Sequence, residues 1–312
     1  MGKPSLFRFT GFILIAFLLS LAGCGGDVLN SIDTPTTGKI KVGVDDSYKL
    51  LMEAELGAFE SLYKYTKINI VVGSEADIIN GFMKDSLPLI IVNRKLTEDE
   101  EKYLNNRQII PKTTWIGYDG LALIVNKENQ DSTIYYDRIS DIFNGKIITW
   151  NQIDPKKTSR DSVKIVFDNY KSGNARYFRE KFNLSKLPPS CFAVQNNEEL
   201  ISFVEKNKNA IGVISVNWVS DKTDTVLHGF IKRIKVLSIS TPGNNDPSSE
   251  FYFPHPGYIA QGDYPFTREV FCINRQTYHG LAFGFSSFIA GPQGQPIVLN
   301  NGLVPRIVAI KH

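Results

Sequence analysis

Apolar and polar positions alternate along this chain in a way that predicts strands and helices in turn. An apolar run at 39–44 predicts a strand, a polar turn follows at 45–47, and apolar residues at helical spacing across 50–62 predict an amphipathic helix. A second strand is predicted directly after it, at 68–72. These elements form a parallel βαβ unit, so we expect a ligand site at the C-terminal ends of its strands.

Polar residues occupy both of these strand ends. Asp46 and Ser47 follow the first strand, and Gly73 and Ser74 follow the second. Because parallel strands present their C-terminal ends to a common crevice, these residues are candidates for binding a ligand. The alternative for Ser47 is that it only caps the helix that follows it.

The next unit adds an arginine to the same edge. A helix is predicted at 77–83 and a strand at 87–92, and Arg94 stands at the mouth of that strand, where it is well placed to bind an oxyanion through two parallel donors. Thr97 and Glu100 form a capping box at the start of a further helix. The acidic residues after Thr97 are therefore predicted to be structural and not to perform acid–base chemistry.

A strand, a turn and a helix start are predicted between residues 163 and 182. Ser172 has the position of an N-cap, followed by Gly173 and Asn174, and Arg176 lies one turn into the helix. A helix N-terminus has unpaired backbone N–H groups and about half a positive charge, so this turn is suited to hold an oxyanion. The alternative is that Ser172 only caps the helix and that Arg176 is solvated.

The rest of the chain repeats the strand and helix alternation. Residues 113–126 predict two extended pieces broken at Asp119–Gly120, where the chain would cross between two domains. A second set of units follows, and the region 281–305 predicts an apolar helix, a Gly-Pro turn and a second helix. The length of the folded body also favours two domains.

The first residues indicate export. Residues 1–23 hold two basic residues, a short apolar run and no acidic residue, which is typical of a secretory signal peptide. Leu21-Ala-Gly-Cys24 resembles the bacterial lipobox, and this resemblance implies a mature protein that begins at a lipid-modified Cys24. The alternative is a plain secreted protein with a stray Cys24. Residues 24–38 are predicted to be a flexible tether.

Charge and chemistry exclude several classes of function. Lys and Arg number 35 against 32 Asp and Glu, and removal of the signal leaves a formal charge of +1, so no nucleic-acid partner is expected. Cys191 and Cys272 lie in apolar contexts that favour two buried thiols over a disulfide. The four histidines lack zinc-like spacing, and Ser172 is not in a G-x-S-x-G elbow. We therefore expect no catalysis, no metal and no cofactor.

Several motifs in their order along the chain resemble the phosphate-binding lipoproteins of bacterial phosphate ABC importers, of the type II periplasmic binding protein superfamily. They are Ala122–Asn126, Asp141–Asn151, Ser172-Gly173 with Arg176 and Phe178, Ala210–Ser215, Tyr264-Pro265 with Arg268, Gly294-Gln295 and Gly302–Pro305. The resemblance implies an α/β fold of two lobes with a two-segment hinge. We place lobe 1 at 39–118 with 259–312, and lobe 2 at 119–258.

The resemblance also implies the site. Its ligand loops fall on Asp46, Ser47, Gly73, Ser74, Asn93, Arg94, Ser172, Gly173 and Asn174. Better-known members have an aspartate in the third loop, which accepts the proton of hydrogen phosphate, and an arginine four residues before the serine; this chain has Asn93-Arg94 and Asp168 there. Arg94 or Arg176 would then supply the positive charge. Asp46, Glu75, Asp119 or Asp168 would accept the proton.

The expected function is that of a membrane-tethered, extracytoplasmic solute-binding protein on the periplasmic side of a bacterial membrane. It would capture phosphate or a related oxyanion as a monomer and deliver it to an ABC permease of the cytoplasmic membrane. The alternatives are a protein of the same fold that binds a different anion, and a sensing or adhesion lipoprotein without transport. The candidate ligand-binding residues are Asp46, Ser47, Ser74, Arg94, Ser172, Gly173, Asn174 and Arg176.

Overall fold

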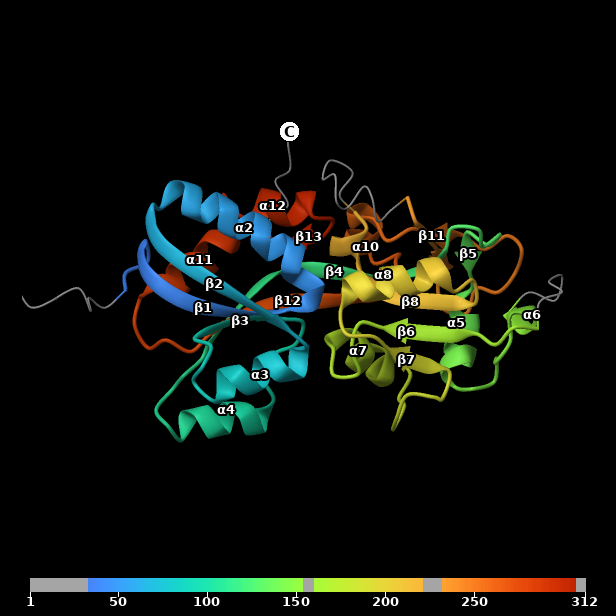
Figure 1. Ribbon diagram of the computed structural model, residues 1–312, viewed down its shortest axis with the longest axis horizontal. Helices are drawn as coiled ribbons and strands as arrows, with labels where there is room; N and C mark the ends of the chain where they lie inside the picture. The colour runs from blue at the N-terminus through green and yellow to red at the C-terminus, as the bar shows by residue number, and fades with distance from the viewer. Residues whose placement is uncertain (1–32, 154–159, 221–231, 307–312) are drawn as a thin grey trace, which may run out of the picture.

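Parallel strands with helices on both faces form the first half of the structure, a computed structural model that describes residues 33–153, 160–220 and 232–306 (Figure 1). The signal peptide, Cys24 and the start of the tether lie outside the described residues. The elements of this half are β1 (Thr37–Asp45), α2 (Lys49–Leu62), β2 (Tyr65–Gly73), α3 (Glu75–Met83), β3 (Leu89–Val92) and α4 (Glu98–Asn105). Strands β2 and β3 both pair with β1 in parallel, which confirms the βαβ prediction.

The end of the predicted tether is held against this half. Strand β1 begins at Thr37, and the carboxylate of Asp33 accepts a hydrogen bond of 2.6 Å from the backbone N–H of Leu281. That N–H opens helix α11 (Leu281–Ile289), where Asp33 satisfies a donor that has no partner inside the helix.

Strand β4 (Lys112–Asn126) joins the two halves. It pairs with β12 (Thr267–Asn274) from Lys112 to Gly120 and with β8 (Ala210–Ser215) from Leu121 to Val125. The prediction of two pieces broken at Asp119–Gly120 is wrong, because one strand continues through this point and only its partner changes. A Cβ atom at Gly120 would lie 2.7 Å from the end of the Ile259 side chain, so Ile259 packs closely against the backbone there.

The second half carries its own parallel strands. Strand β6 (Lys164–Phe167) pairs in parallel with β7 (Cys191–Ala193) and with β8. The other elements of this half are β5 (Thr133–Ile134), α5 (Tyr136–Phe143), α6 (Trp150–Ile153), α7 (Gly173–Lys181), α8 (Asn197–Lys206), η2 (Val216–Trp218), β9 (Ile234–Val236), β10 (Ser238–Ser240), β11 (Phe251–Tyr252) and α10 (Pro256–Gln261). Helix α11, α12 (Gln295–Asn300) and β13 (Val304–Pro305) then follow β12.

The hydrogen-bonded strand order is β2-β1-β3-β12-β4-β8-β6-β7, with β13 and β9 also paired to β4. Figure 1 shows β1 to β3 with α2, α3 and α4 on one side and β6 to β8 with α5, α7 and α8 on the other, while β4 and β12 lie between them. This is the α/β architecture expected of a two-lobed binding protein. The residue boundaries of the two lobes stay a prediction.

The core confirms the prediction for the cysteines. Cys191 and Cys272 are both free and buried, and burial raises the pKa of the Cys191 thiol to about 12. Among the described helices, none is long and apolar enough to cross a membrane.

Candidate functional site

Polar contacts join the two halves around the C-terminal ends of β1 and β6. The hydroxyl of Ser47 donates to the Asn174 side-chain oxygen at 3.3 Å. The carboxylate of Asp46 accepts from both the backbone N–H and the side-chain amide of Asn197, at 2.8 and 2.6 Å. All four side chains are buried, so the halves are closed on each other here.

The loop after β1 is built by Asp45. Its carboxylate accepts a hydrogen bond of 2.8 Å from the backbone N–H of Ser47 and caps the short helix η1 (Asp46–Tyr48). The alternative interpretation of Ser47 as the N-cap is therefore wrong, and the Ser47 hydroxyl is turned toward the second half. Asp45 was not a candidate in the sequence, although it directly precedes two residues that were.

The N-terminus of α7 lies opposite this loop. Ser172 caps α7 by accepting from the backbone N–H of Ala175, as predicted, and the Asn174 amide donates to Asp168 at 2.9 Å. At Gly173 the halves approach so closely that a Cβ atom would lie 2.6 Å from the Asn93 side-chain oxygen. Glycine at this position therefore allows the N-terminus of α7 to meet the first half.

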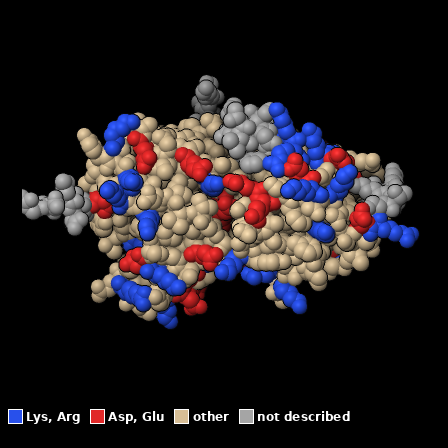
Figure 2. All heavy atoms as spheres, viewed as in Figure 1, with Lys and Arg blue, Asp and Glu red and all other residues tan. Residues whose placement is uncertain are grey.

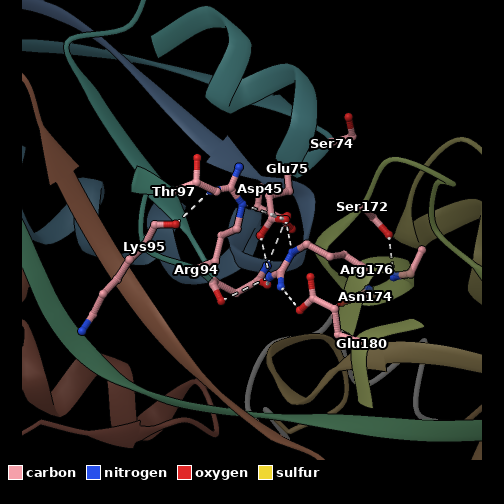
Figure 3. A network of polar contacts seen from close by, with 12 residues as sticks. Asp45, Ser74, Glu75, Arg94, Lys95, Thr97, Ser172, Asn174, Arg176 and Glu180 are labelled. Carbon is pink, nitrogen blue, oxygen red and sulfur yellow. Dashed lines mark hydrogen bonds and ion pairs between the residues drawn. The ribbon is translucent and has the colours of Figure 1, made fainter. Parts of the chain in front are cut away.

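Arg94 and Arg176 converge on Glu75 at the edge of this centre (Figure 3). Arg94 donates to both oxygens of Glu100 at 2.7 and 2.8 Å, and Glu100 also completes the predicted capping box of α4. Arg176 donates to both oxygens of Glu75 at 2.6 and 3.1 Å and to the Asn93 side-chain oxygen at 2.6 Å. Arg176 is thus not a solvated helix residue but an ion-pair partner across the two halves.

A buried arginine that the sequence had not suggested as a ligand lies deeper. Arg268 of β12 is opposite Asp119 of β4 in the register of the sheet, and its Nε donates to Asp119 at 3.0 Å. Asp119 also accepts from the hydroxyls of Ser215 and Tyr48, at 2.8 and 3.2 Å. A signal for this was available: Arg268 has the same alternation phase as the buried Val270.

Two nitrogen atoms of Arg268 are available to donate hydrogen bonds. Its Nη2 lies 2.9 Å from Asp119, but neither Nη1 nor Nη2 makes a hydrogen bond within the part of the chain that the structure describes. Its guanidinium carbon is 5.5 Å from the centre of the Tyr48 ring. The side chain is only 3 % exposed, so these donors are withdrawn from bulk water.

Three buried carboxyls surround this arginine and the start of α7. Burial raises the pKa of Asp45 to about 6, against an opposing effect of Arg268. Burial and the charge of Asp45 raise the pKa of Asp168 to about 7. Burial also raises the pKa of Asp119, against the lowering effect of Arg268. Asp45 and Asp168 therefore take up or release protons near neutral pH.

Two cavities open on the seam between the halves, and their linings differ in charge. One, of about 430 Å³, is lined by residues that include Asp46, Ser74, Asp168 and Glu198. Figure 2 shows acidic side chains gathered between α2 and α8 on that face. The other, of about 530 Å³, has five basic residues in its lining, Arg94, Lys171, Arg176, Arg179 and Lys186, and the acidic residue Glu75.

The structure thus brings most of the candidate residues to one place. Asp46, Ser47, Ser172, Gly173 and Asn174 meet at the buried centre. Ser74 caps α3 by accepting from the backbone N–H of Asp77 and lines the first cavity, whereas Arg94 and Arg176 form the ion-pair group beside it. Across the described ranges, no group of three or more His, Cys, Asp or Glu side chains is arranged to hold a metal ion.

The fold and the closed polar centre define a two-lobed solute-binding protein. Residues 30–293 match the PBP superfamily domain, so the chain belongs to that family. It is similar to the phosphate-binding protein PstS of Staphylococcus saprophyticus, with 22% identity over 290 residues that cover 93% of this chain and 85% of that protein. PstS of Staphylococcus aureus is 21% identical over 230 residues, which cover 73% of this chain and 68% of that one.

Solved structures share the fold. A putative phosphate ABC transporter substrate-binding protein with bound phosphate from Clostridium perfringens superposes with a TM-score of 0.70 at 22% identity, over 86% of this chain and 100% of that chain. An ABC-type phosphate transport receptor from Vibrio cholerae gives a TM-score of 0.60 at 18% identity, over 85% of this chain and 99% of that chain. The predicted type II periplasmic binding protein fold is confirmed.

Proposed function

We propose that this protein captures phosphate between its two lobes and delivers it to an ABC permease. The observation that carries the proposal is the buried N-terminus of α7, where Ser172, Gly173 and Asn174 face Ser47 of the other half. The names of the relatives, which are phosphate-binding proteins and phosphate transport receptors, support the choice of ligand.

The geometry suits an oxyanion for two reasons. The first backbone N–H groups of α7 have no partner inside the helix, and the helix dipole makes its N-terminus favourable for negative charge. The hydroxyls of Ser47 and Ser172 and the amide of Asn174 add donors from both halves. A ligand bound there contacts both lobes at once, so its binding energy stabilises the closed form over the open one.

Buried carboxyls give the site a means to tell phosphate from sulfate. Phosphate carries a proton near neutral pH and sulfate does not. Asp45, when ionised, accepts that proton in a hydrogen bond, whereas beside sulfate the same carboxylate faces an unprotonated oxygen and repels it. This role replaces the third-loop aspartate of better-known relatives, which is Asn93 in this chain.

The proposal extends to the parts of the protein around the site. Lobe 1 comprises about 39–118 with 259–312 and lobe 2 about 119–258, so that β4 and the segment before β12 form the hinge. A lipid on Cys24 tethers the protein to the extracytoplasmic side of a bacterial membrane, where it meets the permease as a monomer. Binding and release, and not catalysis, are its activity.

The competing possibility is that the site prefers another oxyanion, or that the protein serves sensing or adhesion without transport. The observation behind it is the acidic residue Asp168 where better-known relatives have the ligand arginine. Calorimetric titration of the chain without its signal peptide, with phosphate, sulfate and small organic anions in turn, separates these cases.

We expect phosphate to bind with a 1:1 stoichiometry and sulfate to bind at least tenfold more weakly. Tighter binding of another anion would favour the first alternative. A folded protein without affinity for any of the anions would contradict the proposal and favour sensing or adhesion.

A further inference from the structure

We propose that Arg268 of β12 supplies the positive charge that holds the oxyanion, a role that the sequence had given to Arg94 or Arg176. The inference rests on the proposed function and names the ligand cation of the same site. It starts from a comparison of the three arginines. Arg94 and Arg176 have their donors directed at Glu100, Glu75 and Asn93, whereas Nη1 of Arg268 has no hydrogen-bond partner among the described residues.

The unpaired donors of Arg268 indicate that a ligand binds to them. A guanidinium stays charged at all ordinary pH values, and buried polar groups in folded proteins almost always have a hydrogen-bond partner. Asp119 satisfies Nε and faces Nη2, which leaves Nη1 without a hydrogen-bond partner among the described residues. A tetrahedral oxyanion fits such a donor, because a guanidinium can bind two of its oxygens with two nearly parallel hydrogen bonds.

Arg268 interacts with residues of both halves. Its guanidinium lies over the ring of Tyr48, which belongs to the loop after β1. Its charge lowers the pKa of Asp45, also in that loop, and of Tyr177 on α7 in the other half, in each case against the raising effect of burial. The loop after β1 and the first turns of α7 are the two segments that supply the other proposed ligand groups. Arg268 therefore interacts with both of these segments.

The buried carboxyls near Arg268 are partly protonated near neutral pH, which favours the binding of an anion. The groups that interact electrostatically with Arg268 include Asp119, Asp45, Tyr48 and Tyr177. Asp119 neutralises one positive charge, and Asp45 and Asp168 hold protons for part of the time near neutral pH. An anion next to Nη1 then meets a donor, and partial protonation of the buried carboxyls lowers the negative charge that opposes it.

The test compares phosphate affinity among variants by calorimetry at one pH and one salt concentration. Arg268→Gln removes the charge and the fork of donors, and we expect at least a tenfold loss of affinity. Arg268→Lys keeps the charge without the fork, and we expect a smaller loss. Arg275→Gln is the matched control, because Arg275 is also a buried arginine after β12 but donates to Phe82 away from the site, and its affinity should stay within twofold of the parent.

Arg268→Gln leaves Asp119 without its ion-pair partner and is at risk of misfolding. The double variant Arg268→Gln, Asp119→Asn removes both charges, keeps the hydrogen-bonding shapes and should fold, as checked by its thermal transition. It should still bind phosphate at least tenfold more weakly. If the parent binds phosphate and the double variant or Arg268→Lys binds it as tightly, Arg268 is not the ligand cation, although the proposed function stands. If the parent protein binds no phosphate, both the proposed function and this inference are wrong.

Discussion

Arg176 of α7 donates to both carboxylate oxygens of Glu75 of α3, at 2.6 and 3.1 Å, and thereby ties the two halves together at the edge of the site (Figure 3). The carboxylate of Glu75 is 4 % exposed and the Arg176 side chain 19 %. This pair is more deeply buried than the exposed ion pair of Lys171 with Asp77 on the same seam. Its contribution to closure should therefore be larger.

The first prediction is that Glu75→Gln speeds the release of phosphate. The Arg176 contact exists only when the halves are closed, so its loss should raise the dissociation rate at least fivefold and leave the association rate nearly unchanged. Stopped-flow exchange of bound phosphate measures both rates. Glu180→Gln is the control, because Glu180 forms an ion pair with Arg176 within the same helix. Equal dissociation rates for Glu75→Gln and the parent would contradict the idea.

The second prediction concerns Gly173. An alanine there places a Cβ atom 2.6 Å from the Asn93 side-chain oxygen, so the halves cannot close fully. We expect Gly173→Ala to fold but to bind phosphate at least tenfold more weakly in calorimetry. Gly57→Ala provides the comparison, since a Cβ atom in α2 at Gly57 meets no atom within 4 Å and should raise helix stability by about 0.5–1 kcal/mol. Unchanged affinity for Gly173→Ala would show that the close approach is not needed.

The third prediction is a pH dependence that Asp168 imposes on binding. Its pKa is raised to about 7 by burial and by the charges of Asp45 and Asp46, against hydrogen bonds from Ser172 and Asn174. Because the carboxyl is neutral at lower pH and charged above about 7, a rising pH adds repulsion toward an anion. Asp168→Asn stays neutral, so it should bind phosphate as the parent does at pH 5.5 and several-fold more tightly at pH 8.

Comparison of the two proteins at each pH cancels the titration of phosphate itself, because both meet the same ligand. Fluorescence or calorimetric titrations at pH 5.5, 7 and 8 are sufficient. A ratio of the two dissociation constants that does not change with pH would rule out a role for the ionisation of Asp168 in binding.

The fourth prediction concerns stability and not binding. Glu55 of α2 is fully buried, both of its carboxylate oxygens lack a hydrogen-bond partner among the described residues, and burial raises its pKa to about 9 from an ordinary 4.5. The folded protein holds this proton up to about pH 9 and the unfolded chain loses it near pH 4.5. The free energy of unfolding therefore falls as pH rises through this window, by about 1.4 kcal/mol per pH unit.

Glu55→Gln mimics the protonated carboxyl and removes this loss. We expect it to match the parent in urea unfolding at pH 4 and to exceed it by roughly 2–3 kcal/mol at pH 7. Asp45 and Asp168 contribute slopes of the same sign in both proteins, so only the difference is informative. Glu53→Gln, at an exposed position of the same helix, should differ from the parent by a few tenths of a kcal/mol at both pH values. A parallel decline of Glu55→Gln and the parent would contradict the assignment.

The fifth prediction is that Cys24 carries the membrane anchor. Cys24→Ser should move the protein from the membrane fraction to the soluble fraction of the cells that make it, because Cys24 is the cysteine that directly follows the lipobox-like Leu21-Ala-Gly of the signal. Cys191→Ser and Cys272→Ser serve as controls, since both thiols are buried in the folded body. Continued membrane association of Cys24→Ser would refute the anchor.

Local rules in the sequence were sufficient for most of the elements, though not for the unbroken strand β4, and for one side of the site. The capping box of Thr97 and Glu100, the N-cap at Ser172 and the parallel βαβ unit depend on neighbours within a few residues or on periodicity. The burial of both cysteines also followed from their apolar flanks. Each of these features depends on residues close to it in the chain, so the sequence by itself determines it.

Tertiary structure decided the partners of charged groups. Glu100 accepts hydrogen bonds from Arg94, and Arg268 contacts Asp119, which is 149 residues away in the sequence. Asp45 is fully buried between the two halves. An arginine at a strand end can bind a ligand or a nearby carboxylate, and sequence spacing does not distinguish the two. The pKa values of Asp45 and Asp168 depend on how much water the closed halves exclude. Desolvation is a property of the whole packed structure, and no local pattern of residues records it.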